Sequence, residues 1–271
     1  MFLPYRIEKD TVMALPSGSY EAEYNKIQGE LLQKVTDEEL QKILINGSKL
    51  QEVWFPTECM TFDVFLSHSH GDETNAKNLA AYLKSQYNLT TFIDSCYWNY
   101  CDVLLRKLDN QLWEESDGKD LYNYKKRNYS TTIIHSMLSM SLMKMMSKCE
   151  CFLMLDSPNV QFKGDEMQHK TKSAWIYQEV EMSKVLEKKI PERWLPHIVH
   201  HKEGGILEVR LFSTDIAVES QEVTFDLDTS KMHLVDAKLL NKLKGRHGYR
   251  ALDMMHSDYM SKQYHARLLQ G

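Results

Sequence analysis

One carboxylate interrupts an apolar helical stripe in the second half of the chain. Residues 173–182 predict a helix, and Trp175, Glu179, Met182 and Leu186 fall on one face of it at i, i+4, i+7 and i+11. The other three are apolar, so Glu179 is expected to face the protein, where a carboxylate must be desolvated, paired or at the mouth of a cleft. The helix N-terminal dipole would help to keep it ionised. The alternative is a boundary glutamate that reaches solvent.

Three polar side chains, Ser67, His68 and Ser69, follow a short apolar run. Residues 62–66 (FDVFL) predict a buried strand, because four of the five positions are apolar and β-forming types dominate. The polar turn then runs into a predicted helix, which Asp72 can cap. Strand, turn and helix form the first part of a βαβ unit.

A second strand is predicted at residues 89–93, and it completes the βαβ unit, which implies a parallel sheet with a right-handed crossover. Asp94 ends this strand, and a loop that begins at Ser95 and carries Tyr97 and Trp98 is expected after it. Ligands of parallel sheets bind beyond the carboxyl ends of the strands, so this loop and the polar turn are expected at one rim. The aromatic side chains could stack on a ligand, or they could cover the end of the sheet.

The remaining segments extend this α/β pattern. Residues 1–58 are interpreted as a partly helical N-terminal extension, with a capping box formed by Thr36 and Glu39. Residues 236–271 are interpreted as a helical C-terminal extension. Between them we expect helices at 101–115 and 131–148, a third strand at 149–155, and two weaker strands at 207–212 and 223–227.

Bulk composition limits the class of protein. A chain of 271 residues that is 42% hydrophobic can bury a sizeable core, and its net charge of -5 argues against a nucleic-acid partner. The sequence has no apolar run of about 18 residues, so no membrane partner is expected. Its five cysteines are odd in number and form no C-x-x-C, which favours a reducing, cytoplasmic location. No G-x-G-x-x-G follows a strand, so no bound redox cofactor is expected.

Four motifs, taken in order, resemble those of the Toll/interleukin-receptor (TIR) domain of the soluble bacterial type. They are FDVFLSHS with Asp72 after the turn, TTFID with its following loop, CFLMLDSPN, and S-x-W-x-x-x-E. The resemblance spans about residues 60–230, and we assign residues 59–235 to a TIR domain on this basis. It implies a flavodoxin-like, five-stranded parallel sheet flanked by helices.

The resemblance also implies an activity. Many TIR domains cleave NAD+ at the nicotinamide–ribose bond and release nicotinamide with ADP-ribose or a cyclic ADP-ribose isomer, often in anti-phage defence. The glutamate that ends the W-x-x-x-E motif is the family's catalytic residue, which here is Glu179. NAD+ would be a substrate rather than a cofactor, and no metal is implied. Self-association through the TIR domain and a downstream effector that senses the product are the implied partners.

The substrate pocket of the family is formed by the turn after the first strand and the loop after the second. In this chain these are Ser67 to Ser69 and the segment that contains Asp94, Ser95, Tyr97 and Trp98. Trp175 could form a wall of that pocket, or it could be part of the core.

Two departures and two rival interpretations accompany the resemblance. Ile176 stands where the family often has cysteine, and the span between the second and third strands is longer than in receptor TIR domains. One rival is a TIR-like assembly module without catalysis. The other is a metallohydrolase, because His68, His70 and Asp72 resemble an H-x-H-x-D metal motif, although Glu73 replaces its final histidine.

Overall fold

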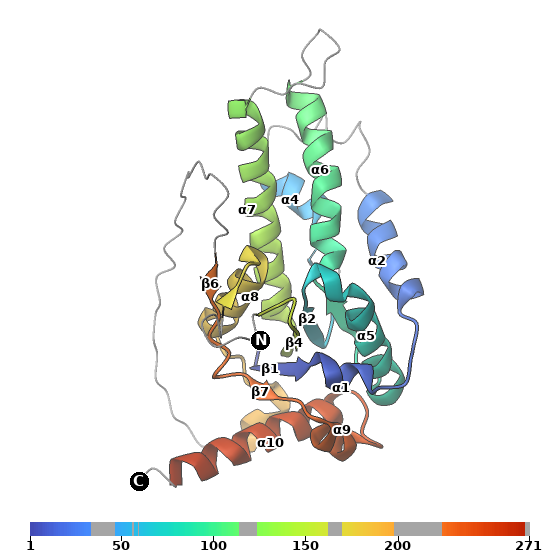
Figure 1. The fold of residues 1–271 in the computed structure, drawn as a ribbon, viewed down its shortest axis with the longest axis vertical. Helices are drawn as coiled ribbons and strands as arrows, with labels where there is room; N and C mark the ends of the chain where they lie inside the picture. Colours follow the sequence, from blue (N-terminus) through green and yellow to red (C-terminus); the bar gives the residue numbers. More distant parts are fainter. Residues whose placement is uncertain are drawn as a thin grey trace.

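A parallel sheet of five strands, in the order β3-β2-β4-β1-β7, forms the centre of the protein (Figure 1). The structure is a computed structural model that describes residues 1–33, 47–55, 57–58, 60–113, 124–161, 170–197 and 224–268. The sheet strands are β1 (Leu3–Glu8), β2 (Val64–Ser67), β3 (Thr91–Ile93), β4 (Cys151–Asp156) and β7 (His233–Leu234). Helices flank this sheet, so the predicted α/β class with a parallel sheet is confirmed, and the arrangement is compatible with a flavodoxin-like fold.

The strand β1 lies inside the sheet, within the segment that was expected to be an N-terminal extension. It pairs in parallel with β4 from Leu3 opposite Cys151 to Glu8 opposite Asp156, and on its other side with β7. The sequence does not predict this strand, because Pro4 lacks the N–H that a residue of a central strand normally donates. In the flavodoxin-like order 2-1-3-4-5 the fourth place belongs to the fourth strand of the chain, whereas here the first strand occupies it.

Apolar side chains on both neighbouring strands, β3 and β4, hold β2 in the interior of the sheet. Phe65 is opposite Phe92 of β3 and Phe152 of β4, and the ring centroids lie 5.4 Å and 5.9 Å apart. All four residues of β2 are buried. Such cross-strand aromatic contacts fix the register, and thereby the position at which Ser67 ends the strand.

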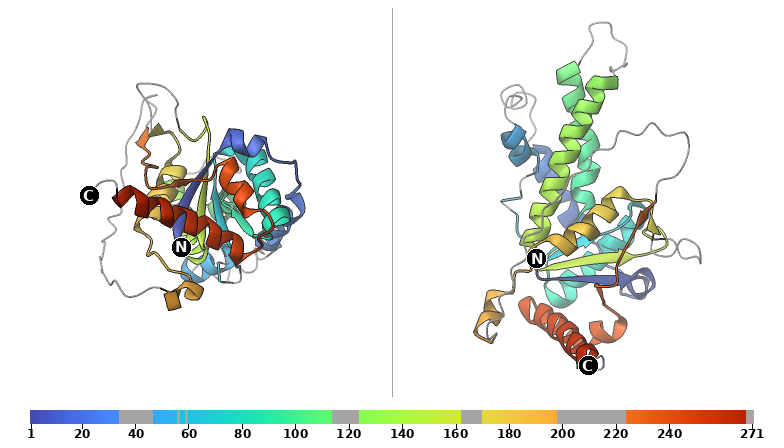
Figure 2. Two further views of the ribbon diagram at one scale, coloured as in Figure 1. Left: turned by 90° about the horizontal axis from the view of Figure 1, so that it is seen from below. Right: turned by 90° about the vertical axis from the view of Figure 1, so that its left-hand side faces the viewer.

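Helices cover both faces of the sheet. They are α1 (Lys9–Met13), α2 (Glu21–Gln33), α4 (Gly47–Trp54), α5 (Glu73–Tyr87), α6 (Ser95–Trp113), α7 (Tyr124–Lys148), α8 (Ala174–Val185), α9 (Ala237–Leu243) and α10 (Tyr249–Leu268), with 3-10 turns at His70–Asp72 and Glu192–His197. The α6 and α7 helices lie side by side and extend beyond the sheet, while α9 and α10 lie on the opposite side (Figure 2). The strands β5 (Lys170–Thr171) and β6 (Phe225–Asp226) form a separate antiparallel pair.

Some predicted elements differ from the observed ones. The α6 helix begins at Ser95, so the loop expected to carry Tyr97 and Trp98 is helical, and β3 leads almost directly into the helix. The Asp94 side chain accepts a hydrogen bond from the Ser95 N–H at 2.8 Å, which satisfies a donor at the helix start. Only Phe225–Asp226 of the strand expected at 223–227 is assigned as a strand. The helix expected after Thr36 and the strand at 207–212 lie outside the described residues.

The C-terminal segment closes the face of the sheet opposite α6 and α7. The Tyr5 hydroxyl of β1 lies 2.6 Å from Nδ1 of His256 in α10, and both residues are buried. Nε2 of His256 lies 2.8 Å from Glu150, which precedes β4, and Arg193 binds both oxygens of that carboxylate. These contacts hold Glu150 ionised, with a pKa lowered to about 2 by hydrogen bonds from His256 and Arg193 that outweigh its burial.

One fully buried carboxylate, Asp72, ties three strand ends together. Oδ1 of Asp72 lies 2.8 Å from Nζ of Lys9, which directly follows β1. Oδ2 accepts hydrogen bonds from Ser157 Oγ at 2.5 Å and from Asn159 Nδ2 at 3.2 Å, and these two residues follow β4. Burial alone would raise the pKa of Asp72, but these three donors outweigh it and the pKa lies below its usual range. The Asp72 side chain was expected to cap α5 by accepting a hydrogen bond from a backbone N–H, but this hydrogen bond is not made.

We predict that Asp72→Asn lowers the free energy of unfolding by about 2–3 kcal/mol at pH 7, because the lost charge weakens three buried hydrogen bonds. The folded-state pKa is depressed, so this stabilisation is present above the usual pKa of 3.8 and is lost as the pH falls through the folded pKa. Urea unfolding at pH 7 and pH 3 measures both effects. Asp10→Asn, which alters an exposed carboxylate one residue beyond Lys9, is the control and should change little. An equal loss in both variants would contradict the prediction.

Candidate functional site

Glu179 is buried, with 1% of its surface exposed. The Ser173 side chain caps α8 by accepting a hydrogen bond from the Ile176 N–H at 3.2 Å. The fully buried face of the helix consists of Ile176, Glu179, Val180 and Ser183, so it is turned by about one residue from the predicted stripe, and Glu179 belongs to both. The interpretation of Glu179 as a boundary residue that reaches solvent is therefore wrong.

Ser67, at the end of β2, is the direct partner of this carboxyl group. Its Oγ donates a hydrogen bond to Oε2 of Glu179 at 2.5 Å, and Ser67 is fully buried. The second oxygen, Oε1, meets no hydrogen-bond donor among the residues that the structure describes. The contact lies at the carboxyl end of β2, next to β4. The boundary between these two strands is a topological switch point, because the chain continues from β2 to β3 on one side and from β4 to β7 on the other. Ligands of open α/β sheets bind at such a switch point.

A second carboxyl group, that of Asp94, lies next to Glu179. Oδ1 of Asp94 is 2.5 Å from Nδ1 of His68, and Oδ2 accepts a hydrogen bond from the His68 backbone N–H at 3.3 Å. Oδ1 also accepts the Ser95 N–H. His68 and Asp94 are 2% and 1% exposed, so water screens their interactions poorly.

Burial and the negative charge of Asp94 raise the pKa of Glu179 well above its usual range. The Ser67 hydroxyl acts in the opposite direction but is outweighed. Burial and the charge of Asp94 thus act against the ionisation that the helix dipole is expected to favour.

Tyr24 supports this site and was not found by sequence reasoning. Its hydroxyl lies 3.1 Å from Ser95 Oγ, and both residues are buried. Tyr24 belongs to α2, in a segment whose sequence carries no motif. A periodicity of buried aromatics at Tyr20 and Tyr24, one helical turn apart, was the available signal.

The predicted site residues therefore divide into two groups. The structure brings together Ser67, His68, Asp94, Ser95 and Glu179. Ser69 lies in the same turn and is half-buried.

The other predicted residues lie on helices α8 and α6. Trp175 is half-buried against α7, where its ring meets that of His135 edge to face at a centroid distance of 5.4 Å. This contact anchors α8 to α7. Tyr97 and Trp98 lie in the first turns of α6 rather than in a loop.

The described residues give no support to the metallohydrolase interpretation. Within residues 1–33, 47–55, 57–58, 60–113, 124–161, 170–197 and 224–268, no three His, Cys, Asp or Glu side chains are arranged to hold a metal ion. His70 points to solvent as an exposed residue of a 3-10 turn, while Asp72 is occupied by Lys9. In the same ranges no helix has the length and apolar character needed to cross a membrane.

Comparisons with protein-family models, with curated proteins and with solved structures find no match to this chain. Its function must therefore be inferred from its own residues and their geometry.

We predict that Glu179→Gln stabilises the protein at pH 8 by about 1–2 kcal/mol, because it replaces a carboxyl group whose ionisation is unfavourable in the folded state. A raised folded-state pKa means that stability is fully present below the usual pKa of 4.5 and declines as the pH rises towards the folded pKa. The gain should therefore grow from pH 4.5 to pH 8, as measured by urea unfolding. Glu181→Gln, on the same helix but half-exposed and paired with Lys184, should show no such trend. A gain that does not depend on pH would argue against the buried, protonated carboxyl.

Proposed function

We propose that this chain is a TIR-type NAD+ nucleosidase in which Glu179 stabilises the transition state of nicotinamide release. The observation that carries the proposal is the burial of Glu179 against Ser67 and Asp94 at the carboxyl ends of the sheet strands. A carboxyl group with a strongly perturbed pKa at a ligand-binding switch point is a candidate for catalysis. The ordered TIR-like motifs supply the reaction class.

The arrangement suits cleavage of a bond to a cationic leaving group. Nicotinamide departs as a neutral molecule from a pyridinium, so the reaction needs no strong general acid. The transition state instead develops an oxocarbenium-like ribose, as in glycoside cleavage, and a nearby negative charge stabilises it. An ionised Glu179 can accept hydrogen bonds from the ribose hydroxyls, and its negative charge opposes the positive charge of the ribose. The positive charge of NAD+ would favour ionisation of Glu179.

Ser67 and His68 act on this pair as positioning residues. Ser67 fixes one oxygen of Glu179, and His68 fixes Asp94 through its ring and its backbone N–H. A site held in this way needs little reorganisation during the reaction. The product would be ADP-ribose or a cyclic isomer, depending on whether water or a second position of the nucleotide captures the ribose.

The site is closed in the ligand-free protein, because Ser67, His68, Asp94 and Glu179 are each at most 2% exposed. NAD+ could reach Glu179 only after these residues are uncovered. This closure supports the expectation that activity requires a trigger or self-assembly, in keeping with a role in anti-phage defence, where unrestrained NAD+ loss would harm the cell.

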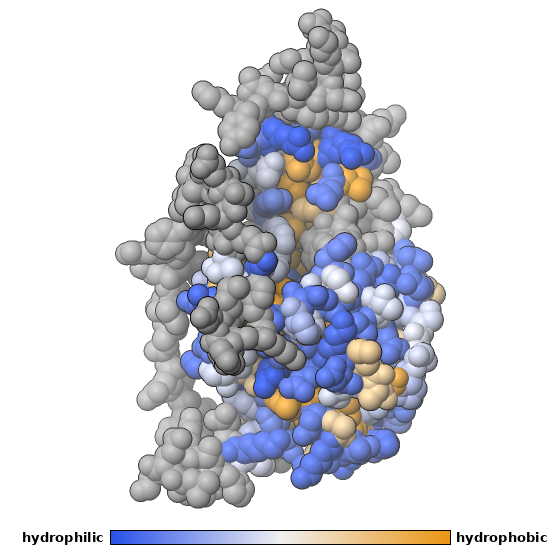
Figure 3. Space-filling model, in the orientation of Figure 1, coloured by the Kyte–Doolittle hydropathy of each residue, from blue (hydrophilic) through white to orange (hydrophobic). Residues whose placement is uncertain are grey.

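An assembly role has support of its own. Large apolar side chains are exposed on the α6–α7 pair, among them Val103, Tyr129 and Met140. Figure 3 shows apolar side chains along these helices, above a lower region that is mainly hydrophilic on this face. Exposed apolar surface marks sites of association. Assembly and catalysis are compatible, and a Glu179→Ala protein that keeps all cellular activity would favour a purely non-catalytic module.

We predict that Glu179→Ala and Glu179→Gln reduce NAD+ turnover at least about 100-fold, since either change removes the negative charge that opposes the oxocarbenium-like ribose. The assay follows nicotinamide release by chromatography, with the purified protein at high concentration to favour assembly. Glu181→Gln should retain turnover. The Glu179→Gln protein is expected to fold. Substantial NAD+ turnover by this variant would contradict the assignment of Glu179 as the catalytic residue.

We further predict that Asp94→Asn moves the acidic limb of the pH–rate profile to lower pH. Turnover requires ionised Glu179, and its pKa is raised by burial and by the charge of Asp94, so removal of that charge lets Glu179 ionise at lower pH. The oxygen of Asn can still accept the Ser95 N–H, whereas the longer hydrogen bond from the His68 N–H to the other oxygen is lost. Asp102→Asn, which changes an exposed residue of α6, should leave the limb in place. If the acidic limb of the pH–rate profile does not move in Asp94→Asn, the proposed effect of Asp94 on Glu179 is contradicted.

A further inference from the structure

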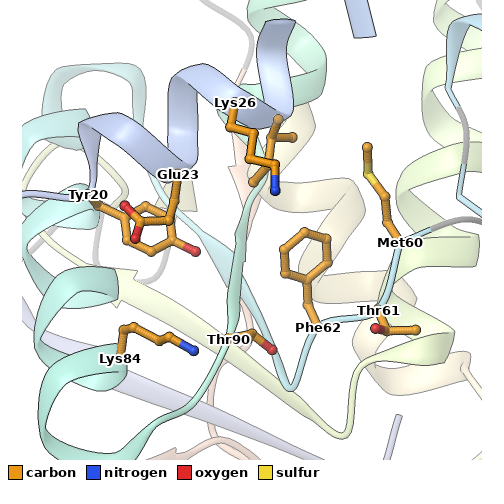
Figure 4. A pocket seen from close by; sticks show the side chains of 9 residues that line it. Tyr20, Glu23, Lys26, Met60, Thr61, Phe62, Lys84 and Thr90 are labelled. Atoms are coloured by element: carbon orange, nitrogen blue, oxygen red, sulfur yellow. The ribbon is translucent and has the colours of Figure 1, made fainter. Parts of the chain in front are cut away.

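A pocket of about 330 Å³ lies at the amino ends of β2 and β3, the opposite end of the sheet from Glu179 (Figure 4). Its walls come from four separate parts of the chain: α2, the segment before β2, the end of α5 and the residue before β3. They are Tyr20, Glu23, Lys26, Ile27, Met60, Thr61, Phe62, Lys84 and Thr90. This volume is within the range of sites that hold small molecules, which begins at about 300 Å³.

One wall of the pocket is apolar. Met60 and Ile27 are each 8% exposed, and the half-buried Phe62 ring lies at the centre of the view in Figure 4. The Phe62 ring contacts that of Phe92, with ring centroids 5.4 Å apart and the ring planes tilted by 57°. An aromatic ring that lines a cavity offers an apolar surface against which a flat ligand can pack.

The opposite side of the pocket is cationic. The amino groups of Lys26, from α2, and Lys84, from α5, both extend towards the cavity in Figure 4. Lys84 is oriented by a hydrogen bond to Asn88 Oδ1 at 3.0 Å. Asn88 ends α5 in the left-handed conformation, with φ 52°. Among the lining residues that the structure describes, Glu23 is the one acid, so two lysines and one glutamate give these residues a net charge of +1.

We propose that this pocket binds a small amphipathic anion, with a flat apolar body against Phe62, Met60 and Ile27 and one acidic group between Lys26 and Lys84. Neither a neutral nor a cationic molecule would use both lysines. The polar groups at the rear are already engaged, since the Tyr20 hydroxyl donates to the Thr91 carbonyl and the Thr90 hydroxyl donates to Asp63. The lysines therefore provide the charge recognition, and the apolar wall provides the remaining affinity.

The proposed site is independent of the candidate catalytic site in its residues. Phe62 and Thr90 precede β2 and β3, whereas Ser67 is the last residue of β2 and Asp94 follows β3. Loss of NAD+ turnover in a Glu179 variant would leave anion binding unaffected. Failure of the anion site would equally leave the proposed reaction untouched.

Two fluorescent probes test the proposal on the full chain. 8-Anilinonaphthalene-1-sulfonate and N-phenyl-1-naphthylamine share one aromatic body and differ in the sulfonate. We expect the Kd of the sulfonate to rise about tenfold or more in Lys26→Gln/Lys84→Gln, while the Kd of the neutral probe changes less than about twofold. Lys238→Gln/Lys244→Gln, with the same loss of charge at exposed positions in and after α9, is the matched control and should change neither Kd.

A second variant and a location measurement complete the test. Thr61→Trp places a large ring at an exposed position of the lining and should weaken both probes about tenfold. In methyl NMR of labelled methionine, the sulfonate should shift the Met60 signal but not that of the exposed Met260. The proposal is overturned if the lysine double variant binds the sulfonate as the unmodified protein does, if Thr61→Trp binds both probes unchanged, or if the Met60 signal does not move.

Discussion

The buried charge of Asp72 is the interaction on which the whole carboxyl rim depends. Its carboxylate is held by Lys9 from the end of β1 and by Ser157 and Asn159 from the segment after β4, while Asp72 itself follows β2. Three non-adjacent parts of the chain thus meet at one pair of oxygens. Gly71 is part of this packing, because a Cβ there would lie 3.0 Å from Asn159 Nδ2. The turn that carries Ser67 and His68 is fixed from both sides.

Two buried carboxyl groups in neighbouring turns of the rim have opposite surroundings, and this contrast defines their roles. Asp72 receives an ammonium, a hydroxyl and an amide, so its pKa is lowered in spite of burial. Glu179 receives one hydroxyl and faces another carboxyl group, so its pKa is raised. Under the proposed function, Asp72 is the structural acid that holds the rim, and Glu179 is the reactive one.

The sequence predicted much of the site and less of the fold around it. Short apolar runs bounded by polar turns located β2, β3 and β4, and the interrupted apolar stripe located α8 and Glu179. Strand β1 was missed because Pro4 argues against a central strand, and only the long-range pairing with β4 overrides that local signal. The aromatic segment after Asp94 was taken as a loop, whereas capping by Asp94 starts the helix at once. The spacing of Tyr20 and Tyr24 indicates a helical face, but the contact of Tyr24 with Ser95 depends on tertiary packing that this spacing does not predict.

The position of β1 has a consequence for biosynthesis. It is synthesised before the other strands of the sheet. Leu3 can pair only after Cys151 has been made, and the other edge of β1 can pair only after His233 has been made. Contacts so distant in sequence slow folding and leave an apolar strand edge exposed meanwhile. Lys9 reaches Asp72 only when β1 is seated, so the rim is assembled among the last parts of the molecule. A ribosome-bound chain that ends before β4 therefore holds Ser67 and Asp94 but neither β4 nor Glu179, so the buried carboxyl site cannot form until both have been made.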